Sequence, residues 1–273
     1  MAPKRKNPSR STRAGGILKA TKSEAIEPSS SAVRASSTQQ VKRALNQSSL
    51  SMLNKLYYFC TRRPKAYEEL SVLVSMFGLY LNRKDSSTLR PKGWISNTVI
   101  LVAGKIMMEE EKATDGVVTR HMFSPHFMIF APTLFEEHWS CYAFEPENKT
   151  LYVLDSMPDK VSISKKNLDD ATKLRFEELL VLKNPSLTQE NASITLLHVD
   201  VPMQPNNHDC GIYVLKYMET WDGSIKWEDK TMPDYSYKEI VKFRQSLICG
   251  WVQHPKNEVR EEILKEAGVW GKL

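Results

Sequence analysis

Residues 204–211 read Gln-Pro-Asn-Asn-His-Asp-Cys-Gly, and this stretch decides how the rest of the chain is interpreted. The apolar run Ile-Tyr-Val-Leu follows at residues 212–215, which places Cys210 in the first turn of an expected buried helix. The N–H groups and the dipole of a helix N-terminus stabilise a thiolate. A cysteine in that position can act as a nucleophile once a base lies beside it.

A candidate base and a candidate orienting acid lie earlier in the chain. Strands are expected over residues 139–144 and 151–154, joined by a turn-like Glu-Pro-Glu-Asn-Lys segment. His138 comes directly before the first strand and Asp155 directly after the second. If the strands pair as a hairpin, both side chains lie at the same end. The carboxylate then accepts a hydrogen bond from the imidazole and fixes its tautomer.

A donor for the oxyanion precedes the candidate nucleophile. Gln204 lies six positions before Cys210, and its side-chain amide can donate together with the backbone N–H of Cys210. Each of these residues also has an ordinary interpretation: a core cysteine, a structural histidine, a turn acid or a loop amide. Their combination favours a set that hydrolyses an amide by thiol attack, with His138 as base and Asp155 as its orienting group.

The remaining pattern indicates an α+β domain, because helices, then strands, then helices follow one another without regular alternation. The apolar spacing predicts helices over residues 67–81, 98–112, 167–183, 210–221 and 237–252. Further strand-like runs cover residues 126–132 and 194–201. Asn97 or Ser96 is the expected N-cap of the second helix.

The N-terminal segment differs from the body in composition and charge. Residues 1–47 are rich in Ser, Lys, Arg and Thr, so we expect a disordered tail followed by one domain over residues 48–273. Residues 1–50 hold ten basic and two acidic residues, a net charge of +8; the rest holds 28 basic and 30 acidic residues, a net charge of −2. The basic cluster at residues 4–6 is either a nuclear import signal or a solvated tail.

Composition excludes several classes of protein. No apolar run approaches the roughly 18 residues of a membrane span, and no apolar segment follows the basic N-terminus as in a secretory signal. The four cysteines are scattered at positions 60, 141, 210 and 249, which argues against a zinc knuckle and a disulfide framework. We therefore expect no cofactor or metal, no membrane contact and a reducing compartment, the nucleus or the cytoplasm. The other three cysteines lack the pattern that flanks Cys210.

The ordered set of motifs resembles the Ulp1-like family of ubiquitin-like-protein proteases. The resemblance covers roughly residues 60–255 and rests on four motifs in order: Gly-Trp-Ile-Ser-Asn at 93–97, His-Trp at 138–139, Leu-Asp-Ser at 154–156 and the stretch at 204–211. It implies a papain-like cysteine protease fold with permuted order, His, Asp, Gln, Cys, in which helices flank a small central mixed sheet. The basic, Ser-rich tail is similar to that of plant members of the family, including those carried by mobile elements.

The resemblance also implies a substrate. Members of the family cleave after the Gly-Gly C-terminus of a small ubiquitin-like modifier such as SUMO, for precursor maturation or deconjugation, and Trp94 and Trp139 are then expected to line a narrow tunnel for the two glycines. The expected partners are the modifier and its conjugates, with the protein a monomer. The family often has an aspartate where Asn97 stands and a glycine where Asn207 stands. The alternative is a domain that binds a modifier without cutting it, or a mobile-element protein whose tail binds nucleic acid.

Overall fold

The structure is a computed structural model that describes residues 47–115, 128–158, 163–184, 186–188, 190–223, 227 and 229–273. The chain divides into residues 1–46 and residues 47–273, and every described residue belongs to the second unit. The expected tail therefore lies, apart from residue 47, outside the described residues. The boundary between tail and domain stays a prediction.

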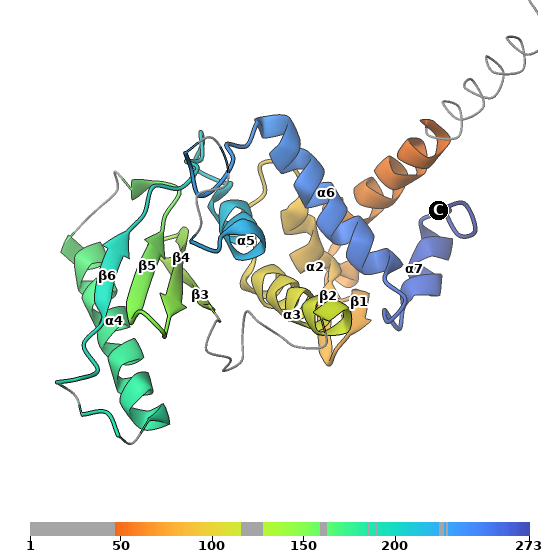
Figure 1. The fold of residues 1–273 in the computed structure, drawn as a ribbon. Helices are drawn as coiled ribbons and strands as arrows, with labels where there is room; N and C mark the ends of the chain where they lie inside the picture. Colours follow the sequence, from red (N-terminus) through yellow and green to blue (C-terminus); the bar gives the residue numbers. More distant parts are fainter. Residues whose placement is uncertain are drawn as a thin grey trace, which may run out of the picture. The chain divides into compact units, whose positions relative to one another are not determined.

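A four-stranded mixed sheet lies at the centre of one half of the described unit (Figure 1). Its strands, in spatial order, are β3 (Ile129–Phe135), β4 (His138–Glu145), β5 (Thr150–Leu154) and β6 (Thr195–His198). The first three pair antiparallel, and β6 joins β5 in parallel. Cys141 pairs with Leu154 and Glu145 with Thr150. The expected hairpin between β4 and β5 is therefore confirmed.

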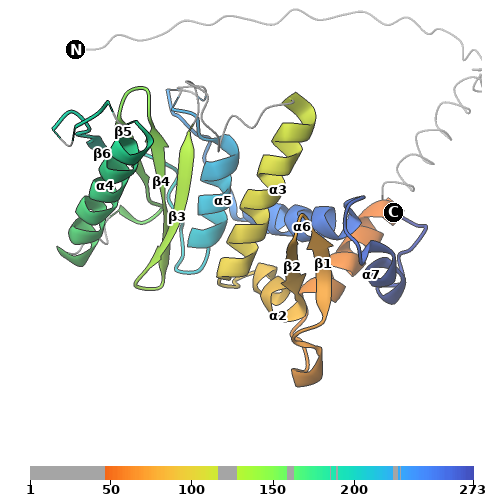
Figure 2. The ribbon, with the colours of Figure 1, turned by 90° about the horizontal axis from the view of Figure 1, so that it is seen from below.

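Each face of the sheet is covered by a helix, as Figure 2 shows. Successive residues of a strand point to opposite faces. On one face, Trp139 and Cys141 share a core with Ile212 of α5 (Cys210–Thr220). On the other face, Tyr142 packs in a separate cluster with Phe176 of α4 (Ile163–Lys183). The sheet is thus a middle layer, and the first turn of α5 lies beside the β4 strand that begins with His138.

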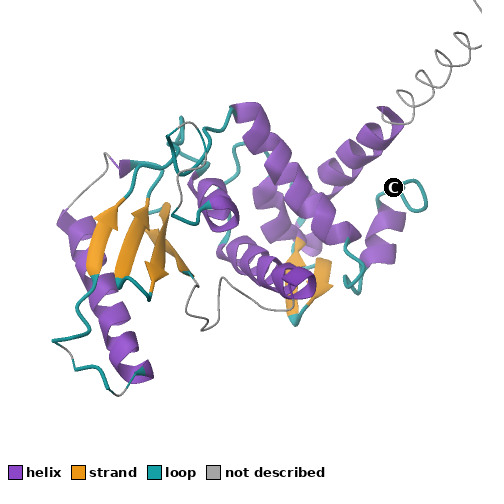
Figure 3. Cartoon of the chain, viewed as in Figure 1, coloured by secondary structure: helices purple, strands orange, loops and turns teal. Residues whose placement is uncertain are grey.

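The other half of the unit is mainly helical (Figure 3). It contains a helix over residues 47–61, α2 (Arg83–Ser86), α3 (Asn97–Asp115), α6 (Tyr237–Gln253) and α7 (Arg260–Glu266), with short 3-10 turns η1 (Ala66–Glu68) and η2 (Ser87–Leu89). Ser96 caps α3, since its hydroxyl accepts from the Val99 N–H. Ser236 and Glu239 form a capping box at the start of α6.

The predicted helix over residues 67–81 is wrong. This segment contains η1 and a hairpin of β1 (Val72–Met76) and β2 (Leu79–Asn82). Phe77 and Gly78 adopt φ values of 54° and 76°, a left-handed pair that makes a tight hairpin turn. The apolar residues of β1 and β2 happened to fall at helical spacing, but Leu70 is 79% exposed and contributes nothing to a core.

The expected fold class is confirmed: the unit is α+β, with a small mixed sheet flanked by helices. The helices predicted over residues 98–112, 167–183, 210–221 and 237–252 correspond to α3, α4, α5 and α6. Among the described helices, none has the length and apolar character needed to span a bilayer.

Candidate active site

The β4–β5 hairpin brings His138 and Asp155 together at one end of the sheet. His138 Nε2 lies 2.7 Å from Asp155 Oδ1, and the same oxygen accepts from the Met157 N–H at 2.9 Å. Both side chains are largely buried, with 17% and 12% exposed. Because Nε2 is engaged by the carboxylate, Nδ1 is the ring nitrogen available to a thiol.

The environment of His138 favours the protonated ring. Burial alone lowers the pKa of an imidazole, but the hydrogen bonds and negative charges of Asp155 and Cys210 outweigh it and raise the pKa of His138 to about 9. For Asp155, burial works to raise the pKa, yet hydrogen bonds from His138 and the Met157 N–H, with the charge of His138, hold it below its ordinary value. The pair therefore exists as imidazolium and carboxylate at neutral pH.

Cys210 lies at the N-terminus of α5, as the sequence predicts. It is 2% exposed and interacts with the imidazole of His138. The next residue, Gly211, lets the helix approach its neighbours closely: a Cβ there would lie 2.8 Å from Ile95 Cβ and 3.2 Å from Trp139 Cδ1. The first N–H groups of a helix have no partner within it, so the backbone at Cys210 offers donors to an anion.

Gln204 is fixed by contacts on both sides of its amide. Its Oε1 accepts from Ser156 Oγ at 2.7 Å, and its Nε2 donates to the Asn206 carbonyl. Because a carbonyl only accepts, this contact sets which end of the amide is nitrogen. One N–H of Nε2 is used by Asn206, and the described residues provide no partner for the second, which can donate to an oxyanion. Ser156 adjoins Asp155, so the candidate oxyanion donor is tied to the segment that carries the acid.

The two tryptophans take different positions. Trp94 is 49% exposed and lines a cleft of about 280 Å³ together with His138, Asp155 and Asn207. Trp139 is only 6% exposed, and its Nε1 donates to the Ile95 carbonyl at 3.2 Å. Trp139 thereby holds the residue after Trp94 against α5. The tunnel role of both rings stays a prediction.

The other cysteines belong to the core. Burial raises the pKa values of the Cys60, Cys141 and Cys249 thiols, that of Cys249 to about 12. Cys141 lies on the sheet face covered by α5, three residues from His138. The described residues contain no group of His, Cys, Asp and Glu side chains that could hold a metal ion.

Two contributors to the site were missed from sequence. Ser156 stands in the Leu-Asp-Ser motif without a role of its own, and none of the sequence motifs includes Arg244, which binds the Asp209 carboxylate at 2.5 Å. A signal for Arg244 exists: it stands in the buried stripe of α6 with Ile240, Leu247 and Ile248. A lone arginine within an apolar stripe indicates a buried ion pair. Through this ion pair Asp209 anchors the loop that precedes Cys210.

A thiol at a helix N-terminus, an imidazolium beside it, a carboxylate behind the imidazolium and an amide at the oxyanion position form the arrangement of a cysteine protease. Comparison with known proteins gives the family. A family described as "Ulp1 protease family, C-terminal catalytic domain" matches residues 94–246. That range includes all of the candidate residues, and the chain belongs to this family of cysteine proteases.

Relatives and solved structures agree with this assignment. Ubiquitin-like-specific protease 1 of Saccharomyces cerevisiae is 27% identical over 208 residues, which cover 66% of this chain and 31% of that protein. Sentrin-specific protease 2 of Homo sapiens is 25% identical over 206 residues, which cover 62% and 33%. The aligned part thus spans about a third of the length of these relatives.

The fold is shared with solved structures. The Chaetomium thermophilum Ulp1-like SUMO protease catalytic domain matches with a TM-score of 0.54 and 14% identity, covering 80% of this chain and 93% of that one. The C-terminal Ulp1 protease domain in complex with Smt3, the yeast ortholog of SUMO, matches with a TM-score of 0.51 and 17% identity, covering 73% and 92%. At these identities the likeness establishes the fold, in agreement with the expected papain-like arrangement.

Proposed function

We propose that this protein is a thiol isopeptidase and endopeptidase that cleaves after the C-terminal Gly-Gly of a small, SUMO-like ubiquitin-like modifier. The observation that carries the proposal is the 2.7 Å contact between His138 and Asp155 beside Cys210 at a helix N-terminus. Two relatives are named as proteases specific for ubiquitin-like proteins and for sentrin, and these names support the choice of modifier. The half-exposed Trp94 at the cleft supports a slot for residues without side chains.

The reaction has two steps. Cys210 Sγ attacks the carbonyl carbon of the last glycine, and the oxyanion accepts from the Gln204 amide and the Cys210 N–H. As the C–N bond breaks, His138 gives its proton to the leaving amine, either a lysine side chain of a target or the α-amine of a precursor tail. The thioester is then hydrolysed by a water that His138 deprotonates, which releases the modifier and restores the thiol. Asp155 keeps the ring oriented and stabilises its charge throughout.

The test is a SUMO-like modifier that carries a C-terminal electrophile. The wild-type protein forms a covalent adduct and Cys210→Ser does not, while cleavage of a modifier–lysine isopeptide falls on the order of 10⁴-fold or more in the variant. Equal labelling of both proteins would show that the nucleophile is assigned wrongly. Labelling by a different modifier in a panel of such probes would keep the chemistry and correct the substrate.

The alternative function is binding without cleavage. The intact set of His138, Asp155, Gln204 and Cys210 argues against it, because binding alone needs none of these side chains in this geometry. A protein that holds the modifier with micromolar affinity but neither reacts with the electrophile nor cleaves the isopeptide would establish the alternative instead.

We propose that the protein is located in the nucleus, and the basic cluster Lys4, Arg5 and Lys6 supports this proposal. Replacing all three residues by Ala in a fluorescent fusion is expected to abolish nuclear accumulation. If the variant still accumulates there, the cluster is not the import signal, and salt-dependent DNA binding of the tail becomes the reading to test.

A further inference from the structure

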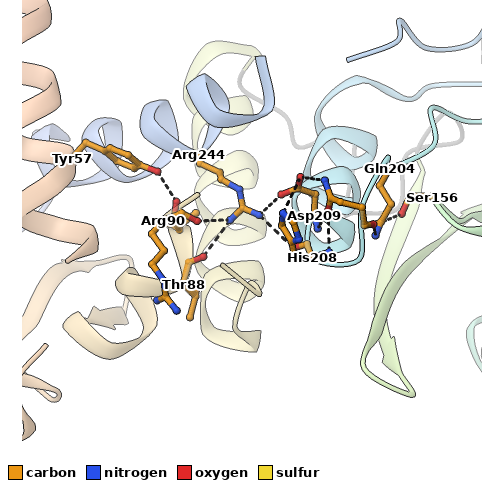
Figure 4. A network of polar contacts seen from close by, with 10 residues as sticks. Tyr57, Thr88, Arg90, Ser156, Gln204, His208, Asp209 and Arg244 are labelled. Atoms are coloured by element: carbon orange, nitrogen blue, oxygen red, sulfur yellow. Dashed lines mark hydrogen bonds and ion pairs between the residues drawn. The ribbon is translucent and has the colours of Figure 1, made fainter. Parts of the chain in front are cut away.

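Arg244 is a buried cation that joins two loops of the candidate site. It is 0% exposed and projects from α6. Its Nη2 donates to Asp209 Oδ1 at 2.5 Å and to the His208 carbonyl at 3.4 Å. Its Nη1 donates in the opposite direction, to the carbonyls of Thr88 at 3.2 Å and Arg90 at 3.3 Å. Figure 4 shows the guanidinium between these two sets of acceptors.

The first loop leads directly to Trp94. Gly93 folds back so tightly that a Cβ there would lie 2.2 Å from the Thr88 carbonyl oxygen and 2.9 Å from that of Arg90. The two carbonyls that Arg244 binds are therefore part of the turn that fixes the backbone position of Trp94. The Tyr57 hydroxyl donates to the Leu89 carbonyl at 2.8 Å and fixes the same turn from outside.

The second loop leads directly to Cys210. Asp209 is the residue before the thiol, and its second carboxylate oxygen accepts from Asn206 Nδ2 at 2.6 Å. Asn206 Oδ1 accepts in return from the N–H groups of His208 and Asp209, at 3.0 and 3.1 Å. The Asn206 carbonyl accepts from Gln204 Nε2. The ion pair is thus continuous, through hydrogen bonds, with the proposed oxyanion donor (Figure 4).

The chemistry of arginine explains why one side chain suffices. A guanidinium is a planar fork with donors on two sides, so it can hold two segments at a fixed spacing, which a lysine ammonium cannot do. Removing the partner of a buried cation strongly destabilises the folded protein, so Arg244 and Asp209 are expected to stay paired. Trp94 and Cys210 are far apart in sequence, and Arg244 is hydrogen-bonded to the loop before each of them.

We propose that Arg244, paired with Asp209, is a positioning residue for the proposed reaction: it fixes the spacing between the Trp94 ring and the Cys210 thiol and holds the oxyanion loop. This inference rests on the proposed function. Arg244 touches no substrate atom and acts through Trp94 and Gln204. Loss of Arg244 should therefore impair reaction with a Gly-Gly substrate much more than it impairs the intrinsic reactivity of the thiol–imidazolium pair.

The experiment compares two reagents on the same full-length variants. The rate of iodoacetamide alkylation of Cys210, followed by mass spectrometry of its peptide, measures the reactivity of the thiol beside His138 without the glycine slot. A SUMO-like modifier with a C-terminal electrophile reports the thiol together with the glycine slot. For Arg244→Met we expect the modifier reaction to slow at least tenfold while alkylation changes less than about threefold.

A matched control is available in Arg83, the first residue of α2, which is 3% exposed and donates to the Phe59 carbonyl at 2.8 Å. Arg83→Met removes a buried arginine of the same kind and should leave both reaction rates unchanged below its unfolding temperature. If Arg244→Met does not fold, Arg244→Lys is measured instead; it keeps the charge but loses the fork, and the same split is expected. Equal slowing of both reagents in the Arg244 variant, or equal slowing in the two arginine variants, overturns the positioning role.

A double-mutant cycle tests the route through Trp94. If Arg244 acts by placing Trp94, then Arg244→Met should slow the reaction with the modifier probe less than about threefold when it is made in a Trp94→Ala protein. A full tenfold loss in that background overturns the placement of Trp94. A wild-type protein that alkylates at Cys210 but never reacts with any modifier probe overturns the proposed function, and this inference with it. If the modifier probe labels the wild type but the Arg244 variant shows no difference between the two reagents, the inference is overturned and the proposed function stands.

Discussion

The imidazole of His138 lies between a carboxylate and a thiol, and this position sets the pH range over which the protein can work. The pKa of the ring is raised to about 9 by Asp155 and Cys210 against the opposing effect of burial. An ordinary histidine loses its proton near pH 6.5. Here the imidazolium, which protonates the leaving amine in the proposed reaction, persists through neutral pH and disappears as the pH rises through about 9.

The expected pH profile follows directly. With a modifier–lysine isopeptide as substrate, kcat/KM should stay high at neutral pH and fall as the pH passes about 9. Steady-state rates between pH 6 and 10.5 measure this limb, and an NMR titration of the His138 ring assigns it. A limb near pH 6.5 would contradict the electrostatic account of His138.

Asp155→Asn tests the origin of the raised pKa. The substitution removes the charge and the acceptor that favour the imidazolium, while the burial that lowers the pKa of His138 remains. The alkaline limb should move to lower pH, and the rate should fall on the order of 10²–10⁴-fold. Asp200→Asn is the control, because Asp200 lines a separate groove. An unchanged limb in Asp155→Asn would mean that another group holds the ring protonated.

Among the elements, α5 packs closely against the segment at Ile95, and this packing can be tested with two helix glycines. A Cβ at Gly211 would lie 2.8 Å from Ile95 Cβ, whereas one at Gly250 in α6 meets nothing within 4 Å. Gly211→Ala should destabilise the protein by about 1–3 kcal/mol through overpacking. Gly250→Ala should stabilise it by about 0.5–1 kcal/mol through helix propensity.

Urea unfolding of both variants measures the two free energies. Gly211→Ala should also slow the reaction with the modifier probe, because Ile95 adjoins Trp94 and would be displaced with it. A Gly211→Ala protein as stable and as active as the wild type would show that α5 and the segment at Ile95 can separate at no cost. The close contact would then not position the site.

A helix or strand could be predicted from the sequence when a local pattern of apolar and turn residues specifies it. The long helices α3, α4 and α6 have sustained apolar spacing, and the β4–β5 hairpin has a turn between two short apolar runs. The sequence does not predict the β1–β2 hairpin because Phe77 adopts a left-handed conformation in its turn, and a phenylalanine is not a residue that indicates such a turn. Its β-branched and apolar residues then matched helical spacing by coincidence.

The candidate site shows the same division between local and distant information. His138, Asp155 and Cys210 could be proposed from the sequence because each stands at or beside the end of an element, and Gln204 because it lies in the loop before α5. Arg244 lies 34 positions after Cys210 within a regular helix. Only the folded chain shows that its guanidinium reaches both Asp209 and the carbonyl of Thr88. The apolar stripe of α6 indicates that Arg244 has a buried partner, but the identity of the partners depends on tertiary packing, which no local pattern reports.

For the molecule as a whole, charge and chemistry belong to different parts of the chain. Residues 1–50 have a net charge of +8 and the remainder a net charge of −2. The family match at residues 94–246 includes every candidate site residue, and both hydrophobic clusters are built from residues after position 50. A protein of residues 47–273 should therefore keep its stability and its catalytic rate, within about twofold of the full chain.

The same truncation should remove any affinity for nucleic acid. Phosphate binding by a cluster of lysines and arginines weakens steeply with salt, because each neutralised phosphate releases condensed counterions. DNA binding by the full chain, measured between 50 and 200 mM salt, should fall steeply, and the protein of residues 47–273, whose net charge is close to −2, should not bind. If the truncated protein binds DNA as well as the full chain does, the basic residues of the folded unit must form a surface of their own. If it loses its peptidase rate instead, the tail takes part in recognising the modifier or its conjugate, and the separation of charge from chemistry is wrong.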